Sequence, residues 1–78
     1  MIPATVNGYT IRGALPAPRF GDDAFVLIVA RTHDYATAIW RPQMGPDEWW
    51  QGNYGFMLLS EAVQDALERT GLFREQVA

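Results

Sequence analysis

The sequence offers few residues that could perform catalysis. His33 is the only histidine, Ser60 is the only serine, and cysteine is absent. A hydrolytic Ser-His pair would need Ser60 as its nucleophile, but Ser60 precedes an apolar helical stripe, which is the usual place of a helix N-cap. His33 with Asp34 could begin a general-base arrangement, although such pairs in tight turns commonly bond nearby backbone groups. We therefore predict no catalytic residue and no enzyme activity.

Metal and cofactor sites are also not predicted. One histidine without cysteine does not supply the three or four converging ligands of a zinc site. The acidic pairs at 22–23 and 47–48 lie beside glycine or proline, as solvated turn residues do, and they lack the alternating spacing of a calcium loop. Gly52 and Gly55 are not followed by the lysine or the further glycine of a phosphate-binding loop. We expect no metal and no small-molecule cofactor.

Aromatic residues between positions 40 and 54 form the strongest candidate for a binding surface. The predicted contact residues are Trp40, Arg41, Trp49, Trp50 and Tyr54. Adjacent residues of a strand point to opposite faces, so at most one of Trp49 and Trp50 can pack under a helix. Trp, Tyr and Arg dominate the energetics of protein interfaces. We interpret this set as a surface for another protein or for a second copy of the chain, a homodimer. The structural alternative is that the 15–23 connector or the tail covers it.

Two other functions would use different residues. Glu61, Asp65 and Glu68 are spaced to line one helix face and could imitate phosphates, as in an anti-CRISPR-like counter-defence protein that inhibits a nucleic-acid-binding effector. The aromatic rings could instead stack on bases of single-stranded nucleic acid. A formal net charge of −3 is modest for a mimic and opposite in sign to most nucleic-acid binders. Both functions therefore rank below protein binding.

The composition indicates a single small domain that spans residues 1–78. Of the 78 residues, 49% are hydrophobic and 19% are charged, which is enough apolar material for one core but not for two. The lack of cysteine favours a reducing compartment. Neither a basic leader nor an apolar run of about 20 residues is present, so we expect a cytoplasmic protein without a membrane anchor.

Turn residues and β-branched runs predict an antiparallel sheet. Asn7-Gly8 favours a type I′ hairpin. That turn sets the pairs Val6 with Tyr9, Thr5 with Thr10, and Ala4 with Ile11, with Pro3 restricting the first arm to an edge or a short stub. Residues 24–30 are apolar throughout, which is typical of a central strand buried on both faces, and residues 36–41 return as its neighbour. We expect an extended connector over 15–23.

The later elements are a weak strand and a helix. Residues 49–54 predict a short or bulged edge strand, because Gly52 and Gly55 interrupt the aromatic run. The helix is expected to begin after an N-cap at Ser60 and to end near Thr70, before a left-handed Gly71. Its apolar stripe consists of Leu59, Ala62, Val63, Ala66 and Leu67, and its solvent face of Glu61, Gln64, Asp65, Glu68 and Arg69.

The predicted fold is a two-layer α+β domain. It has an antiparallel sheet of three to four strands in the order β-β-β(-β)-α, with the C-terminal helix on one face and residues 72–78 as a docked or frayed tail. One helix covers one face of the sheet, yet the central strand is apolar on both sides. The second face therefore needs another cover, and we expect the aromatic surface there.

Overall fold

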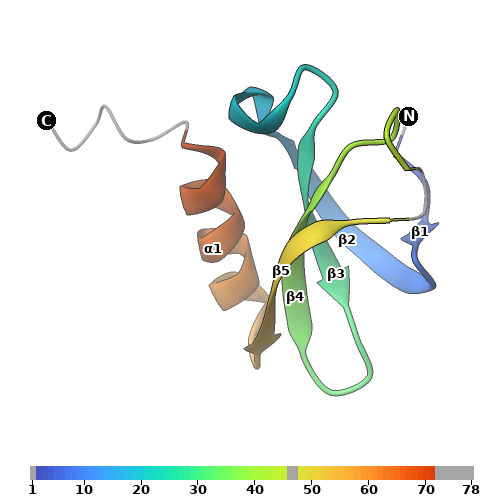
Figure 1. Ribbon diagram of the computed structural model, residues 1–78. Coiled ribbons are helices and arrows are strands. Elements are labelled where there is room, and N and C mark those ends of the chain that lie inside the picture. The colour runs from blue at the N-terminus through green and yellow to red at the C-terminus, as the bar shows by residue number, and fades with distance from the viewer. Residues whose placement is uncertain (1, 46–47, 72–78) are drawn as a thin grey trace, which may run out of the picture.

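The computed structural model describes residues 2–45 and 48–71. Within these ranges lie β1 (Thr5–Val6), β2 (Tyr9–Pro16), a 3-10 helix η1 (Pro18–Phe20), β3 (Phe25–Ala30), β4 (Tyr35–Trp40), β5 (Trp50–Phe56) and α1 (Leu59–Thr70). The strands form one antiparallel sheet in the order β1-β2-β3-β4-β5, and α1 packs on one face (Figure 1). The α+β class, the antiparallel sheet and the C-terminal helix are confirmed. The predicted docked or frayed tail falls on residues 72–78, which lie outside the described residues.

The sheet has five strands, so the prediction of three to four is wrong. The first hairpin arm is a strand of only two residues, and it begins at Thr5, so Pro3 lies outside the paired residues. The predicted connector is also too long, because Leu15 and Pro16 extend β2 and pair with Val26 and Phe25. The φ angle to which proline is restricted suits the extended end of a strand. The connector is therefore reduced to the segment that holds η1.

The hairpin between β1 and β2 has the predicted register. Val6 pairs with Tyr9 and Thr5 with Thr10, and the Ile11 N–H donates to the Ala4 carbonyl at 2.9 Å. Asn7 and Gly8 both have positive φ angles, 54° and 80°, as a type I′ turn requires. The turn therefore fixes Tyr9 at the start of β2, directly opposite the buried Val6.

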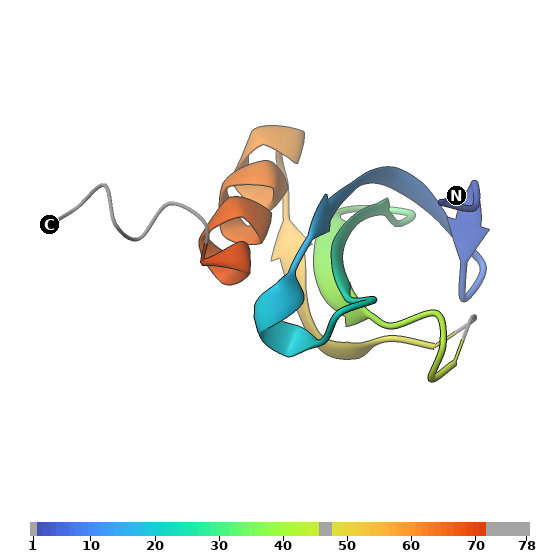
Figure 2. The ribbon, with the colours of Figure 1, turned by 90° about the horizontal axis from the view of Figure 1, so that it is seen from above.

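The sheet is strongly curved, and this curvature covers its second face. Viewed from above, the strands form an arc with α1 on the outer side, while β1 and the start of β5 lie at its open ends (Figure 2). The outer core, against the helix, contains Ala17, Val26, Ile28, Ile39, Ala62 and Ala66. The inner core contains Val6, Leu27, Val29, Ala36 and Trp40. β3 thus supplies alternate residues to both cores, as its continuous apolar sequence predicts.

Irregular pairing on both sides of the central strands accompanies the curvature. The β2–β3 register shifts between Ile11 and Gly13, and the β4–β5 register shifts twice between Tyr35 and Ile39. Bulges of this kind bend a strand and increase its twist. The predicted bulged edge strand is confirmed, since β5 pairs only with β4 within the described residues. The bulges therefore let a small sheet wrap around the inner core.

The N-cap of the helix lies two residues before the predicted one. Leu58 is at the N-cap position and Ser60 lies inside the first turn, so Ser60 is not the N-cap. The first turn is closed by Glu61, whose Oε1 accepts from the N–H groups of Met57 and Leu58, each at 3.1 Å. A carboxylate there also interacts favourably with the helix dipole. The predicted end is confirmed, because Gly71 is left-handed with φ 73°.

A polar network joins α1 to the sheet, and it corrects the predicted solvent face of the helix. The hydroxyl of the buried Thr37, in β4, donates to Asp65 Oδ2 at 2.5 Å and accepts from Arg69 Nη1 at 3.1 Å. Arg69 Nη2 donates to the Gln51 carbonyl at 2.6 Å, and Asn53 Nδ2 donates to Asp65 Oδ2 at 3.1 Å. Asp65 and Arg69 therefore face the sheet instead of solvent. Burial lowers the pKa of Arg69, and the nearby Asp65 carboxylate opposes that shift.

The Thr37 hydroxyl is the centre of this network. In Thr37→Val the shape is kept, but Asp65 and Arg69 each lose a partner in a poorly solvated place. We expect the free energy of unfolding to fall by about 1–3 kcal/mol, measured by urea denaturation. Thr10→Val, on exposed strand surface, is the matched control and should change stability by less than about 0.5 kcal/mol. Equal effects of the two substitutions would contradict the role of the network.

Candidate functional site

Three aromatic side chains from separate segments meet on the inner side of the sheet. Trp49, in the loop before β5, stacks on Tyr9 of β2 with ring centroids 5.4 Å apart and planes 23° from parallel. The Trp49 indole Nε1 donates to the Tyr54 hydroxyl of β5 at 3.2 Å. The Arg31 guanidinium lies over the Tyr54 ring, 4.6 Å from its centroid. We call Tyr9, Trp49, Tyr54 and Arg31 the aromatic row.

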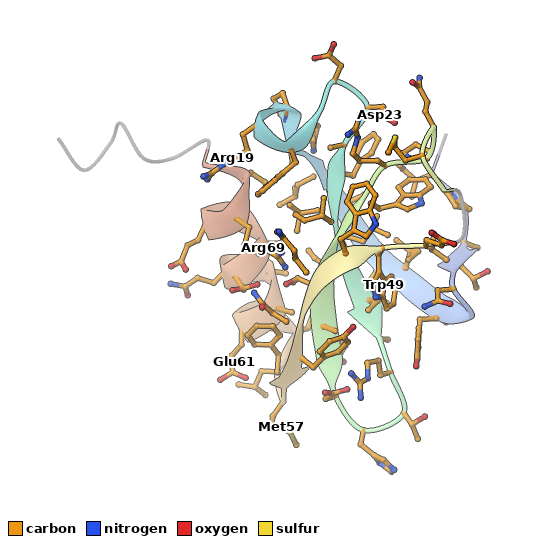
Figure 3. All side chains as sticks on the ribbon, viewed as in Figure 1. Arg19, Asp23, Trp49, Met57, Glu61 and Arg69 are labelled. Atoms are coloured by element: carbon orange, nitrogen blue, oxygen red, sulfur yellow. The ribbon has the colours of Figure 1, made fainter. Side chains whose placement is uncertain are left out.

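The aromatic row lies across the mouth of the curved sheet. Trp49 packs against the inner core, and Figure 3 shows it on the side of β5 away from α1. Tyr9 comes from the hairpin at one end of the arc, whereas Trp49 and Tyr54 come from the other end. The stack therefore bridges strands that are not hydrogen-bonded neighbours in the sheet. It closes the inner core and also leaves ring surface exposed, with Tyr9 37% and Tyr54 51% accessible.

Hydrogen bonds from the β3–β4 turn position the charged end of the row. Asp34 Oδ1 pairs with Arg31 Nε at 3.0 Å, and Asp34 Oδ2 accepts from the Gly55 N–H at 2.7 Å. The carboxylate thus ties the turn to β5 and holds Arg31 over Tyr54. Asp34 bonds a backbone group, as expected for a turn residue. His33 next to it is exposed.

A groove of about 400 Å³ lies beside the row, lined in part by Tyr9, Arg31, His33 and Met57. It offers a ring face, a guanidinium and an imidazole to a bound group. Gly52 lies under the Tyr54 ring, and a Cβ atom at that position would displace the ring from where it now lies. The backbone of β5 therefore allows the ring to lie flat along the strand.

The structure brings together only two of the five predicted contact residues, Trp49 and Tyr54. Trp40 is wrongly placed in that set, because it is only 3% exposed and packs in the inner core with its ring centroid 5.9 Å from that of Phe25. Trp50 is 40% exposed, but it pairs with Ile39 and so lies on the helix side of the sheet. The prediction misses Tyr9 and Arg31, because both lie far in the sequence from Trp49 and Tyr54. The hairpin turn places Tyr9 locally but does not reveal its contact with Trp49.

Arg41, the remaining predicted contact residue, is held away from the row. Its Nε donates to Asp23 Oδ1 at 3.0 Å, and the Gln43 N–H donates to Asp23 Oδ2 at 3.1 Å. Arg41 also lies over Gly21, where a Cβ atom would be 2.7 Å from Nε. Gly21 has φ 143°, which L side chains rarely adopt. Asp23, labelled in Figure 3, therefore links the β2–β3 connection to the end of β4.

The acidic residues of the helix do not form the predicted array. Glu61 closes the first turn of α1, and Asp65 is bound to Thr37 and Asn53. Glu68 is exposed, whereas Asp65 is half-buried. Two of the three carboxylates therefore have structural roles that a phosphate mimic would have to give up.

Sites for other chemistry are not found in the described part of the chain. Residues 2–45 and 48–71 contain no group of three or more acidic or histidine side chains that could hold a metal ion. In the same ranges, no helix combines the length and hydrophobicity needed to cross a bilayer. Ser60 lies on α1 and His33 on the β3–β4 turn, without a hydrogen bond between them.

Comparisons with protein-family models, with curated proteins and with solved structures gave no match.

The two adjacent tryptophans should differ in their effect on stability. Trp49→Ala removes the ring that closes the inner core, and we expect a loss of about 2 kcal/mol or more in the free energy of unfolding. Trp50→Ala removes a more exposed ring and should cost about 1 kcal/mol or less. Urea denaturation of both variants makes the comparison. A larger loss for Trp50→Ala would show that the two rings are placed the other way round.

The Asp23 carboxylate should contribute stability that depends on pH. Burial raises its pKa, but the hydrogen bonds from Arg41 and Gln43 outweigh this, and the pKa lies below the ordinary value of 3.8. The ionised group therefore stabilises the fold above that value, and the contribution disappears as the pH falls through the lower folded pKa. The free energy of unfolding of the wild type and of Asp23→Asn is measured between about pH 7 and about pH 2.5. The difference between the two should be largest near neutral pH and should disappear in acid.

Asp22→Asn is the control for this pH series, since Asp22 is exposed next to the same site. It should change stability little at any pH. A difference in the free energy of unfolding between wild type and Asp23→Asn that stayed constant over the whole pH range would contradict the stabilising role of the ionised Asp23 carboxylate.

Proposed function

We propose that this protein is a non-catalytic interaction module that binds another protein through the aromatic row. The observation that carries the proposal is the continuous contact from Tyr9 through Trp49 to Tyr54, with Arg31 over the last ring. These side chains are fixed in place and still partly exposed. Aromatic and arginine side chains with these properties are the usual anchors of protein interfaces.

The rigidity of the row supports binding. Its members come from a tight hairpin, a turn tied by Asp34 and a strand held by the sheet. Little side-chain freedom is then lost when a partner docks, so more of the contact energy appears as affinity. The open groove next to Tyr9 gives a partner side chain a place beside the rings.

Local charge favours a protein partner over single-stranded nucleic acid. Arg31 is the cation of the row, and Asp34 pairs with it at 3.0 Å. The positive charge available to phosphates is thereby reduced, in a chain whose formal net charge is already −3. Affinity for nucleic acid depends mainly on phosphate neutralisation. The rings therefore suit apolar and aromatic groups of a protein better than a phosphate backbone.

The test uses substitutions that change the row but not the core. Proteins that copurify with the full chain from cells are identified, and each purified candidate is titrated against wild type, Tyr54→Ala and Met44→Ala by calorimetry. Tyr54→Ala should raise the Kd by about 30-fold or more, equivalent to about 2 kcal/mol. Met44→Ala removes an exposed apolar group elsewhere and should change the Kd by less than about threefold.

The same titration with a single-stranded oligonucleotide separates the alternatives. Partner binding that is equally tight in wild type, Tyr54→Ala and Tyr9→Ala would contradict the proposal. So would salt-sensitive oligonucleotide binding that is lost in those two variants, because it would assign the row to nucleic acid.

A further inference from the structure

The groove beside the aromatic row is lined by both apolar and charged side chains. Tyr9 and Met57 supply apolar surface, and Met57 is 70% exposed. The β3–β4 turn supplies Arg31, His33 and Asp34. Figure 3 shows Met57 at the end of the molecule where this turn also lies. With a volume of about 400 Å³, the groove is at the lower end of the range of ligand sites, so it suits one or two side chains of a partner.

Arg31 is the charge that this groove leaves available. Its side chain is 33% exposed, whereas that of Asp34 is 14% exposed. Both carboxylate oxygens of Asp34 have partners, because Oδ1 pairs with Arg31 Nε and Oδ2 accepts from the Gly55 N–H. The carboxylate of Glu61 is also engaged, since it accepts from the Met57 N–H at 3.1 Å. A partner that enters the groove therefore meets a cation with unused N–H groups and carboxylates that are already bonded.

The guanidinium of Arg31 is held in place with donors to spare. It carries five N–H groups in a planar fork. Asp34 lies 3.0 Å from its Nε, and its Cζ lies 4.6 Å from the centre of the Tyr54 ring. In the part of the chain that the structure describes, Nη1 and Nη2 donate to no other group of the protein. Two such nitrogens can bind both oxygens of one carboxylate, and a guanidinium that is already fixed loses little freedom in doing so.

The ion pair with Asp34 favours a single carboxylate over a chain of phosphates. At a distance the charges of Arg31 and Asp34 cancel, which removes the long-range attraction on which polyanion binding depends. At contact range the Nη edge of Arg31 still donates two hydrogen bonds. We infer, on the premise of the proposed function, that the groove binds a carboxylate of the protein partner on Nη1 and Nη2 of Arg31. An apolar side chain next to that carboxylate lies against Tyr9 and Met57.

The test uses a probe that carries one aromatic ring and one carboxylate. N-acetylphenylalanine is titrated into the full chain and followed by NMR, with N-acetylphenylalaninamide as the neutral control of the same shape. A fragment of this size is expected to bind with a Kd of roughly 1 mM. The acid should bind about fivefold or more tightly than the amide, because only the acid is a charged acceptor. The Arg31 Nε–H resonance should shift, and that of Arg12 should not.

A second pair of probes identifies the source of the carboxylate. The acetylated and amidated dipeptide of phenylalanine and aspartate carries its carboxylate on a side chain, whereas N-acetylphenylalanine carries it at the end of a chain. A preference for either acid over its own amide supports the inference. The tighter of the two acids shows whether the partner contributes an acidic side chain or its C-terminus.

Three variants assign the preference to the guanidinium. Arg31→Gln should abolish the difference between acid and amide. Arg12→Gln causes the same change in net charge on an exposed part of β2 and should keep that difference. Arg31→Lys keeps the charge but not the fork, so it should reduce the preference to about twofold or less. This variant also replaces Arg31→Gln if the latter fails to fold.

Four results would overturn the inference. They are equal affinity for acid and amide, no binding of either up to about 20 mM, a preference that is unchanged in Arg31→Gln and Arg31→Lys, and binding of phenyl phosphate about tenfold tighter than that of the acid. The proposed function fails on a different result. If the aromatic row binds a partner without this carboxylate site, Tyr54→Ala still weakens partner binding, while Arg31→Gln weakens it no more than Arg12→Gln does.

Discussion

The central constraint on this fold is that β3 must be buried on both faces although the described residues contain a single α-helix. Alternate residues of Phe25–Ala30 belong to two separate cores, and α1 covers only the outer one. The inner core is covered by the curvature of the sheet, which brings its two ends together (Figure 2). The stack of Tyr9 on Trp49 then closes this core. The same closure brings Tyr54 and Arg31 beside that stack. Burial of the central strand and formation of the candidate binding surface are thus consequences of one curvature.

Polar contacts fix how the layers sit on this apolar framework. Thr37 lies in the middle of β4, and its hydroxyl joins Asp65 and Arg69 of α1. Hydrophobic packing alone is not directional, whereas hydrogen bonds between defined atoms set the position of the helix along the strand. The Arg41–Asp23 pair acts similarly where the chain leaves β4. Arg41 and Asp65 therefore have structural partners within the fold.

Local signals in the sequence predict much of the fold and little of the site. Asn7-Gly8 predicts the hairpin register, the β-branched run predicts β3, and Gly71 predicts the end of α1, because each depends on residues close in sequence. The aromatic row depends on contacts across about 40 residues, which no local pattern contains. Trp40 illustrates the difference. Tryptophan is a residue type typical of interfaces, but the curvature that buries Trp40 appears only when all strands are assembled. The inward orientation of Asp65 and Arg69 is likewise hidden in the sequence, because their partners lie on strands far away in the chain.

The closure of the sheet by Tyr9 and Trp49 is the claim on which both the fold and the proposed surface depend. A nuclear Overhauser spectrum of the full chain in solution tests it directly, since protons of two rings with centroids 5.4 Å apart exchange magnetisation efficiently. We expect strong cross-peaks between the Tyr9 ring and the Trp49 indole. Their absence, with the Asn7-Gly8 hairpin still formed, would mean that the inner core is open and that the aromatic row does not exist as described.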